Sequence, residues 1–274
     1  MMPSPSERWR MPLLIRITLV LHAAMPVALV LAPENWEWVL AGFVANHAVL
    51  TFAGLWPRSS WLGSNWIMLP PASVARGEIA LTIDDGPNPE VTPKVLELLD
   101  RYGVKATFFC IGEQAARYPD LCKSIVERGH AVENHSQHHR HHFSLLGPKG
   151  FAREIEAGQE TLEAITGRRP QFFRAPAGLR NPFLDPVLSR LGLRLAAWTR
   201  RGFDTRTGDP AIVLGRLLSA IRPGSILLLH DGNCARTNQG EPVILAVLPP
   251  LIEAAEAAGL RFVTLSSALQ ATRS

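Results

Sequence analysis

The sequence has few cysteines, and their pattern gives no disulfide framework. Three cysteines occur in 274 residues, at positions 110, 122 and 234. They are far apart, odd in number and form no Cys-x-x-Cys pair, so we expect ordinary thiols. Cys110 lies in an apolar run, where a thiol packs as a small hydrophobe. This cysteine usage is compatible with a reducing compartment.

Strong charge of either sign is also lacking. The net charge is +4, and the lysines and arginines are scattered along the chain. A nucleic-acid-binding surface normally gathers basic residues into a patch, often interleaved with aromatic residues. We therefore expect no nucleic-acid partner.

A cleavage site of small residues is missing after the first long apolar stretch. That stretch covers residues 13–32, and a second one covers residues 36–56. Each has the ~20 mainly apolar residues that a membrane-spanning helix needs, and Pro33-Glu34-Asn35 between them is typical of a tight turn. Residues 1–57 are therefore predicted to form a helical hairpin in the membrane. Five tryptophans near the ends of the stretches fit positions at the membrane interface: Trp36, Trp38, Trp56, Trp61 and Trp66.

Two alternatives to the membrane hairpin stay open. The first is a signal peptide, although a second apolar stretch follows at once. The second is a hairpin buried inside a soluble protein. Four polar residues within the apolar stretches keep that alternative open: Arg16, His22, Asn46 and His47.

Basic residues flank only one end of the predicted hairpin. Three arginines precede or open the first stretch and Arg58 follows the second, whereas the turn contains no Lys or Arg. The three are Arg8, Arg10 and Arg16. The positive-inside rule then places both ends of the hairpin, and the domain that follows, on the cytoplasmic side. Residues 58–76 are expected to form a linker along the membrane surface.

From Gly77 onward, short apolar runs alternate with amphipathic stretches. We expect strands at Ile79–Ile83, Ala106–Ile111, Ala131–Glu133, Phe172–Arg174, Leu193–Trp198, Ser225–Leu229 and Arg261–Leu265. We expect helices at Thr92–Tyr102, Pro119–Arg128, Gly150–Thr166, Phe183–Leu191, Pro210–Ile221 and Pro242–Ala258. The alternation predicts an α/β fold with a parallel sheet, open or closed into a barrel. In such folds the functional residues gather at the carboxyl ends of the strands.

Two adjacent carboxylates end the first expected strand. Asp84 and Asp85 follow an apolar run and precede a turn that begins at Gly86. Two acids this close raise the pKa of one carboxyl unless a cation or an Arg holds both ionised. The pair therefore indicates a metal site, a general base or both. An ordinary Asp-Gly turn with solvated acids is the alternative.

A histidine-rich segment follows the third expected strand. His135 and His139 are four residues apart, so on one helical turn both imidazoles lie on the same face and suit two ligands of one metal. With Asp85 they would make a set of two histidines and one carboxylate, which leaves positions open for water and substrate. His138 and His142 have the same spacing, and a histidine-rich surface loop is the alternative.

Three more strand ends carry charged or titratable side chains. Arg174 is the last residue of the fourth expected strand. An Arg at this position can hold a nearby carboxylate ionised and oriented. Asp204 follows the fifth strand, and His230 ends a fully apolar one. Alone, each has an ordinary interpretation: a surface Arg in a turn, a loop acid and a buried ring. Five strand ends of this kind are hard to explain by chance.

The motifs resemble a known family. Thr-Ile-Asp-Asp-Gly, His-Ser-Gln-His-His, Arg-Ala-Pro-Ala-Gly, Gly-Phe-Asp and Leu-Leu-His, in this order and at these intervals, are similar to the five motifs of the polysaccharide deacetylases, the NodB-homology type of carbohydrate esterase. The resemblance covers residues 77–274 and leaves out the hairpin. It implies a distorted (β/α) barrel. It also implies a metal-dependent hydrolase that removes an N-acyl group, expected to be N-acetyl, from an amino sugar in a polysaccharide or glycolipid.

The same resemblance implies roles for the first three motifs. Asp85, His135 and His139 would bind a divalent metal, usually zinc in this family. The metal would polarise the amide carbonyl and lower the pKa of bound water. Asp84 would be the general base that takes the water proton, and Arg174 would orient it.

The last two motifs would supply the acid, and the third motif would also supply the oxyanion site. His230 would donate a proton to the departing amine, with its pKa raised by Asp204. The backbone N–H of Ala177 would hold the oxyanion together with the metal. This chain departs from the family twice, because Ala177 stands where an aromatic residue is usual and Thr205 where a Trp is usual.

These replacements leave the identity of the substrate sugar undefined, since the aromatic residues usual in the family shape the sugar pocket. The nearby arginines at 200, 201 and 206 suggest a phosphate-bearing or lipid-linked sugar. We therefore expect an amino-sugar polymer or a lipid-linked sugar as substrate, and the membrane as a second partner. A deformylase or amidase acting on a lipid-linked amino sugar is one alternative, and a non-catalytic carbohydrate-binding membrane protein is another.

Overall fold

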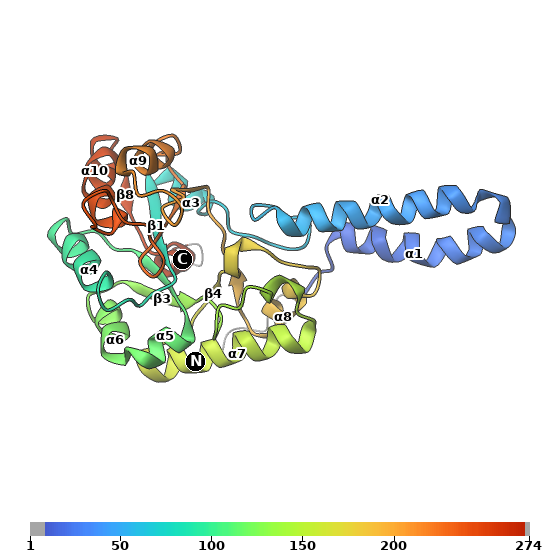
Figure 1. Ribbon diagram of the computed structural model, residues 1–274, viewed down its shortest axis with the longest axis horizontal. Helices are drawn as coiled ribbons and strands as arrows, with labels where there is room; N and C mark the ends of the chain where they lie inside the picture. Colours follow the sequence, from blue (N-terminus) through green and yellow to red (C-terminus); the bar gives the residue numbers. More distant parts are fainter. Residues whose placement is uncertain (1–8, 272–274) are drawn as a thin grey trace.

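The computed structural model describes residues 9–271. Arg8, used above to predict the membrane orientation, lies outside these residues, and so do the last three residues of the expected catalytic domain. A helical hairpin projects from an α/β domain (Figure 1). The hairpin consists of α1 (Leu13–Leu31) and α2 (Trp36–Leu55), joined by a 3₁₀ turn at Pro33–Asn35.

The hairpin presents apolar side chains to its surroundings. Both helices are long and apolar enough to cross a membrane, and no residue of α1, all of which is described, is buried. Val30, for example, is 81% exposed. A hairpin buried inside a soluble protein would cover these side chains, so the structure does not support that alternative.

Four polar side chains of the hairpin pair with each other or with the helix backbone, and they belong to Thr18, His22, Asn46 and His47. The Thr18 hydroxyl donates to the Asn46 side-chain oxygen at 3.1 Å, between the two helices. His22 Nδ1 lies 2.7 Å from the Thr18 carbonyl oxygen, and His47 Nδ1 lies 2.9 Å from that of Phe43. Hydrogen bonds of this kind allow polar residues to lie between apolar helices. The polar residues are therefore compatible with an apolar outer surface.

The domain is built on a parallel sheet that curls into an incomplete barrel. Its strands are β1 (Glu78–Asp84), β2 (Thr107–Cys110), β3 (Ala131–Asn134), β4 (Phe172–Phe173), β5 (Arg194–Leu195), β6 (Arg200–Arg201), β7 (Ile226–His230) and β8 (Arg261–Phe262). The order is β5-β4-β3-β2-β1-β7-β6, with β8 beside the start of β1, and each of these strand pairs is parallel. The expected distorted (β/α) barrel is confirmed.

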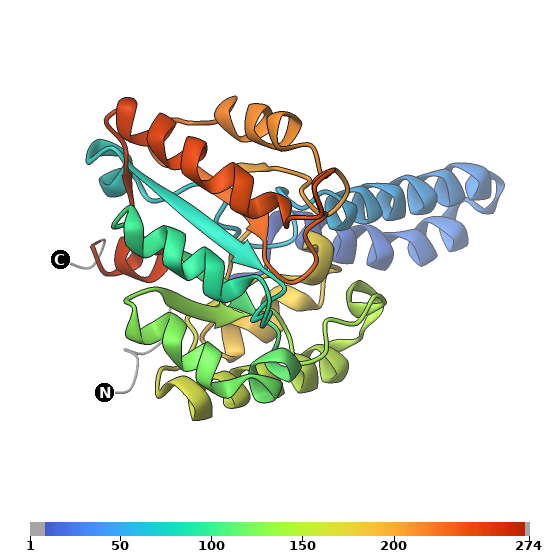
Figure 2. The same ribbon diagram turned by 60° about the vertical axis from the view of Figure 1, so that its left-hand side comes forward.

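Helices pack around the outside of the sheet (Figure 2). They are α3 (Pro71–Ala75), α4 (Thr92–Arg101), α5 (Gly112–Arg117), α6 (Pro119–Glu127), α7 (Pro148–Thr166), α8 (Leu184–Arg190), α9 (Pro210–Leu218) and α10 (Val243–Ala257). The last helix, α11 (Leu265–Gln270), packs instead against Ala80, Phe109 and Phe172. Short 3₁₀ turns form at Phe143–Leu145 and Pro176–Gly178. The main core lies between the central strands and α4, α9 and α10, and most of its apolar side chains are buried.

The gap between the edge strands β5 and β6 is lined by the segment that follows the hairpin. The Trp66 N–H donates to the Leu195 carbonyl and the Ala197 N–H to the Trp66 carbonyl, while the Leu69 N–H donates to Gly224. Edge strands have unpaired backbone groups, and this segment satisfies some of them. The expectation of a surface linker over residues 58–76 is therefore wrong for Trp66–Leu69. Trp66 itself packs on a core aromatic ring, so its predicted place at the membrane interface is also wrong.

Three strands differ from the sequence expectation by more than one residue. The run expected as a strand at Arg261–Leu265 forms only the short β8, because α11 begins at Leu265. The run Leu193–Trp198 forms only the short β5, and the Trp198 ring packs against Ile67 and Leu228 instead of extending the ladder. The strand Arg200–Arg201 was not expected, because two charged residues carry no apolar pattern. Its partner is the buried strand β7.

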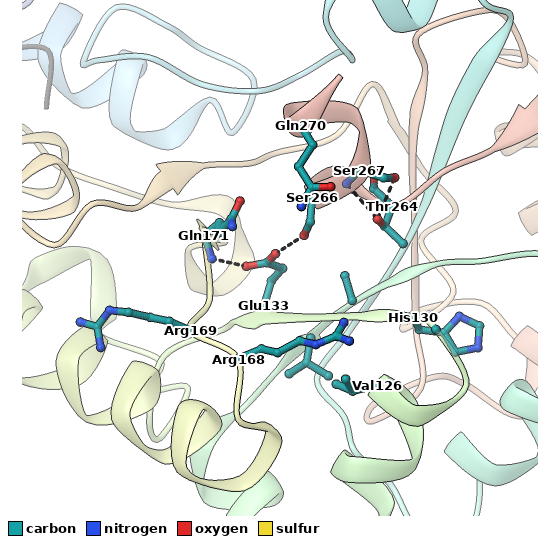
Figure 3. A pocket seen from close by; sticks show the side chains of 13 residues that line it. Val126, His130, Glu133, Arg168, Arg169, Gln171, Thr264, Ser266, Ser267 and Gln270 are labelled. Carbon is teal, nitrogen blue, oxygen red and sulfur yellow. Dashed lines mark hydrogen bonds between the residues drawn. The ribbon is translucent and has the colours of Figure 1, made fainter. Parts of the chain in front are cut away.

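A cavity of about 410 Å³ opens where β3 begins (Figure 3). Glu133 in its wall accepts hydrogen bonds from the backbone N–H groups of Gln171 and Phe172, at 2.7 and 2.8 Å, and from the Ser266 hydroxyl at 2.7 Å. Burial raises the pKa of Glu133 to about 7, although the Ser266 hydrogen bond opposes this. None of the predicted site residues, all of which are described, lines this cavity. Glu133 joins β3 to the start of β4 and to α11.

We expect Glu133→Ala to lower the free energy of unfolding by about 1–3 kcal/mol, because buried donors lose their acceptor. The measurement is urea unfolding of the full chain in detergent, followed by circular dichroism. The control is Glu163→Ala, which removes a half-exposed partner of Arg169 and should cost less than about 0.5 kcal/mol. Equal losses in the two variants would contradict this role of Glu133.

Candidate active site

Asp85, His135 and His139 converge at the carboxyl ends of β1 and β3. His135 Nε2 lies 3.2 Å from Asp85 Oδ1, and His139 Nε2 lies 3.3 Å from the same oxygen. One ligand atom from each residue lies within 4.8 Å of the others. Ligands about 2.0–2.1 Å from a tetrahedral metal are separated by roughly 3.3 Å. The donor spacing therefore fits one metal ion.

The two histidines reach this position through a turn, not through a helix. Ser136 and His139 have left-handed φ values of 65° and 49°. The Asn134 side chain accepts from the Ser136 N–H, and the Ser136 hydroxyl accepts from the His139 N–H, at 2.8 and 3.0 Å. Such local side-chain bonds compete with helix formation. The predicted helical turn is wrong, but the predicted histidine pair is brought together.

Neighbouring groups orient the ligand atoms. His135 Nδ1 donates to the Arg174 carbonyl at 2.8 Å, which leaves Nε2 free to face Asp85. The Asn233 amide donates to Asp85 Oδ2 at 3.1 Å, so that Oδ1 faces the histidines. The sequence analysis missed Asn233, and its place just after the His230 strand is the signal that could have found it.

The protonation states suit metal binding. Burial lowers the pKa of His139 to about 4, so this ring is neutral at neutral pH. Burial acts to raise the pKa of Asp85, but the hydrogen bond and charge of His135 act the other way and bring it well below its usual range. Burial acts to lower the pKa of His135, whereas Asp84 and Asp85 raise it overall. Protons and a metal therefore compete for His135 more than for the other two ligands.

Asp84 is held by a buried arginine. Arg174 Nη1 lies 2.6 Å from Asp84 Oδ1 and also donates to the Thr82 hydroxyl at 2.9 Å. The second Asp84 oxygen lies 3.8 Å from His135 Nε2, on the side of the ligand cluster. The arrangement presents one carboxylate oxygen to the cluster and fixes the other.

His230 is held by Asp204 in the same region. His230 Nδ1 lies 2.9 Å from Asp204 Oδ1, and the His230 backbone N–H donates to Asp204 Oδ2 at 2.7 Å. Burial acts to lower the pKa of His230, but the Asp204 hydrogen bond and charge raise it overall. His230 lies opposite Asp84 in the β1–β7 ladder, so an acid candidate and a base candidate lie side by side.

Two other expected features remain outside this cluster. Ala177 is exposed, with a left-handed φ of 55°, in the turn after β4. Within the described part of the chain, no hydrogen bond joins Ala177 to the ligands, so its role stays a prediction. His138 pairs with Glu154 at 3.0 Å, which directs it away from a shared site with His142.

Comparisons with known proteins identify relatives of this chain. The family model "Polysaccharide deacetylase" matches residues 72–196. A peptidoglycan-N-acetylglucosamine deacetylase of Bacillus cereus is 29% identical over 223 residues, which are 79% of this chain and 78% of that protein. A chitooligosaccharide deacetylase of Azorhizobium caulinodans is 37% identical over 158 residues, 57% of this chain and 75% of that protein.

A crystal structure of the Bc1960 peptidoglycan N-acetylglucosamine deacetylase superposes with a TM-score of 0.67 at 28% identity, covering 74% of this chain and 91% of that one. The expected fold and the expected class of enzyme, a hydrolase of amide bonds, are confirmed. By its motifs, its barrel and its relatives, the chain belongs to the polysaccharide deacetylase family.

Proposed function

We propose that the chain is a metal-dependent deacetylase that hydrolyses the N-acetyl group of an amino sugar in a polysaccharide or glycolipid. One observation carries the proposal: three metal-type ligands, a carboxylate held by an arginine and a histidine held by a carboxylate meet at one end of the barrel. Relatives named as peptidoglycan and chitooligosaccharide deacetylases support it.

The ligand set favours zinc. Two imidazole nitrogens and one carboxylate oxygen are a common set for catalytic zinc, which keeps positions open for water and substrate. A metal held by Asp85, His135 and His139 would polarise the amide carbonyl and lower the pKa of water.

The remaining residues move protons and hold charge. Asp84 accepts the proton of the attacking water, while Arg174 keeps the carboxylate in place. The water oxygen forms a bond to the carbonyl carbon, and the carbon–nitrogen bond then breaks. His230 donates a proton to the departing nitrogen, which leaves as a neutral amine. The exposed Ala177 backbone N–H faces the developing oxyanion in this proposal.

Substitutions separate the base from the metal ligand. We expect Asp84→Asn to retain about one metal ion per chain while acetate release falls roughly 10²–10⁴-fold. Asp85→Ala should lose the metal, since one of three ligands is gone. Metal content of the purified full chain and acetate release from an N-acetylated oligosaccharide measure the two effects.

Near-normal turnover by Asp84→Asn would show that the base is assigned wrongly. A wild-type chain that binds no metal under metal-replete conditions would favour the non-catalytic carbohydrate-binding alternative over either hydrolase.

The Asp204–His230 pair should set the alkaline limb of the pH profile of kcat/KM. The pKa of His230 is raised above its ordinary value, and the donating imidazolium is present below that pKa and lost as the pH rises through it. Asp204→Asn lowers the pKa of His230, so the alkaline limb of kcat/KM should move to lower pH. The control is Asp209→Asn, which can still cap α9 and should leave the limb in place. An unmoved limb in Asp204→Asn would refute the assignment.

We also propose that α1 and α2 span a membrane, with the domain on the cytoplasmic side. Their length and exposed apolar surface support insertion. Among the described residues, Arg10, Arg16 and Arg58 lie at the domain end of the hairpin, and the Pro33–Asn35 turn has no basic residue.

A topology reporter tests this orientation. A reporter that works only in the cytoplasm should be active when fused to the C-terminus and inactive when inserted in the Pro33–Asn35 turn. The full chain should stay with the membrane fraction after an alkaline wash and be released by detergent. The reverse reporter pattern, or release by the wash alone, would contradict the proposal.

A further inference from the structure

Arg201, at the end of β6, is held by aromatic rings. Its guanidinium carbon lies 4.5 Å from the centre of the Phe203 ring and 5.4 Å from that of Trp198. Within residues 9–271, its guanidinium makes no hydrogen bond or ion pair, and Nε is buried without a partner. Aromatic contacts of this kind hold an arginine in one orientation. The hydrogen-bonding positions of Arg201 are therefore available to a group that the protein does not supply.

Arg201 lies beside the active-site cluster. In the β6–β7 ladder it pairs with Leu228, two residues before His230. The Trp198 ring that contacts Arg201 also lies 5.8 Å from the guanidinium of Arg174. Burial lowers the pKa of Arg201, and the charges of Asp204 and Asp84 oppose this. The guanidinium is therefore within electrostatic reach of the catalytic carboxylates.

The same tryptophan connects this position to the base of the hairpin. Trp198 packs against Ile67, which lines a cavity of about 340 Å³ together with Trp56 and Trp61. Gly178 follows Ala177, and a Cβ at Gly178 would lie 2.6 Å from Pro57 and 2.7 Å from Trp198. The end of the apolar hairpin thus lies next to the residues that border the site.

We propose that the substrate is an amino sugar that carries a phosphate group, and that Arg201 binds this phosphate. The inference rests on the proposed deacetylase function and narrows its substrate class. A guanidinium donates two parallel hydrogen bonds to a phosphate, and a neutral polysaccharide offers it no anion. The phosphate belongs to a lipid carrier or to a soluble sugar phosphate, and the nearby hairpin base favours the lipid carrier.

Three substrates test the proposal with the metal-loaded full chain in detergent micelles. They are N-acetylglucosamine 1-phosphate, the same sugar phosphate esterified with a polyprenyl chain, and neutral tri-N-acetylchitotriose. We expect Arg201→Gln to lower kcat/KM for both phosphate-bearing sugars at least about tenfold more than for the neutral one. The matched control is Arg200→Gln. The sequence grouped Arg200 with Arg201, but the structure places Arg200 exposed on the other face of the strand, so this variant should leave the ratio unchanged.

A preference of about tenfold for the polyprenyl substrate over the soluble sugar phosphate supports a lipid carrier, and equal rates support a soluble sugar phosphate. Both results support phosphate recognition by Arg201. Equal losses on the neutral and the phosphate-bearing sugars in Arg201→Gln would overturn it, and so would a wild-type preference for the neutral oligomer.

Failure of the deacetylase function itself is distinguishable. In that case no substrate releases acetate, and calorimetric binding of N-acetylglucosamine 1-phosphate to the Asp84→Asn variant still reports on Arg201. The inference is supported if the affinity of the Asp84→Asn, Arg201→Gln double variant for this sugar phosphate is at least about tenfold lower than that of Asp84→Asn. Equal affinities of the two variants would overturn the inference.

Discussion

The buried ion pair between Arg174 and Asp84 connects the barrel wall to the candidate active site. Arg174 is only 1% exposed, and removing such a charge from water costs several kcal/mol unless its donors are satisfied. Here four acceptors and an aromatic ring surround it: the carbonyl oxygens of Ala196 and Ala197, the Thr82 hydroxyl, the Asp84 carboxylate and the Phe109 ring. The Arg174 carbonyl also accepts from His135. One residue therefore fixes the proposed base, orients a metal ligand and joins β1 to β4 and β5.

The two arginines that contact Trp198 differ in what surrounds them. Arg174 has its donors filled by the protein, so it can hold a carboxylate but has little capacity for a ligand. The guanidinium of Arg201 has aromatic contacts but no hydrogen-bond partner among the described residues. This contrast is the physical basis for giving Arg174 a positioning role and Arg201 a role in substrate recognition. Because Trp198 also packs against the segment that follows the hairpin, both roles lie close to the apolar helices.

Much of this arrangement was predictable from local patterns, and the errors have identifiable causes. The long apolar strands ending at Asp84 and His230 were predicted well because burial on both faces leaves a continuous apolar run. The strand Arg200–Arg201 has no such run, and its pairing depends on β7. Trp66 was placed at the membrane interface from its position near an apolar stretch, whereas its ring packs against Phe172, more than a hundred residues later in the chain, and is half-buried in the domain. Asn233 was missed because its contact with Asp85 joins two loops.

By itself, the sequence determined which residues end the strands, how many apolar residues precede them, and that two apolar stretches could cross a membrane. These properties are local, since a strand end or a spanning helix follows from neighbouring residues. Only the tertiary structure decided that Asp85 meets His135 and His139 at 3.2 and 3.3 Å, and that His139 reaches the site through a left-handed turn. It also decided that the guanidinium of Arg201 has no hydrogen-bonding partner within the described chain. Such facts depend on strand register and side-chain direction, which packing between distant segments sets.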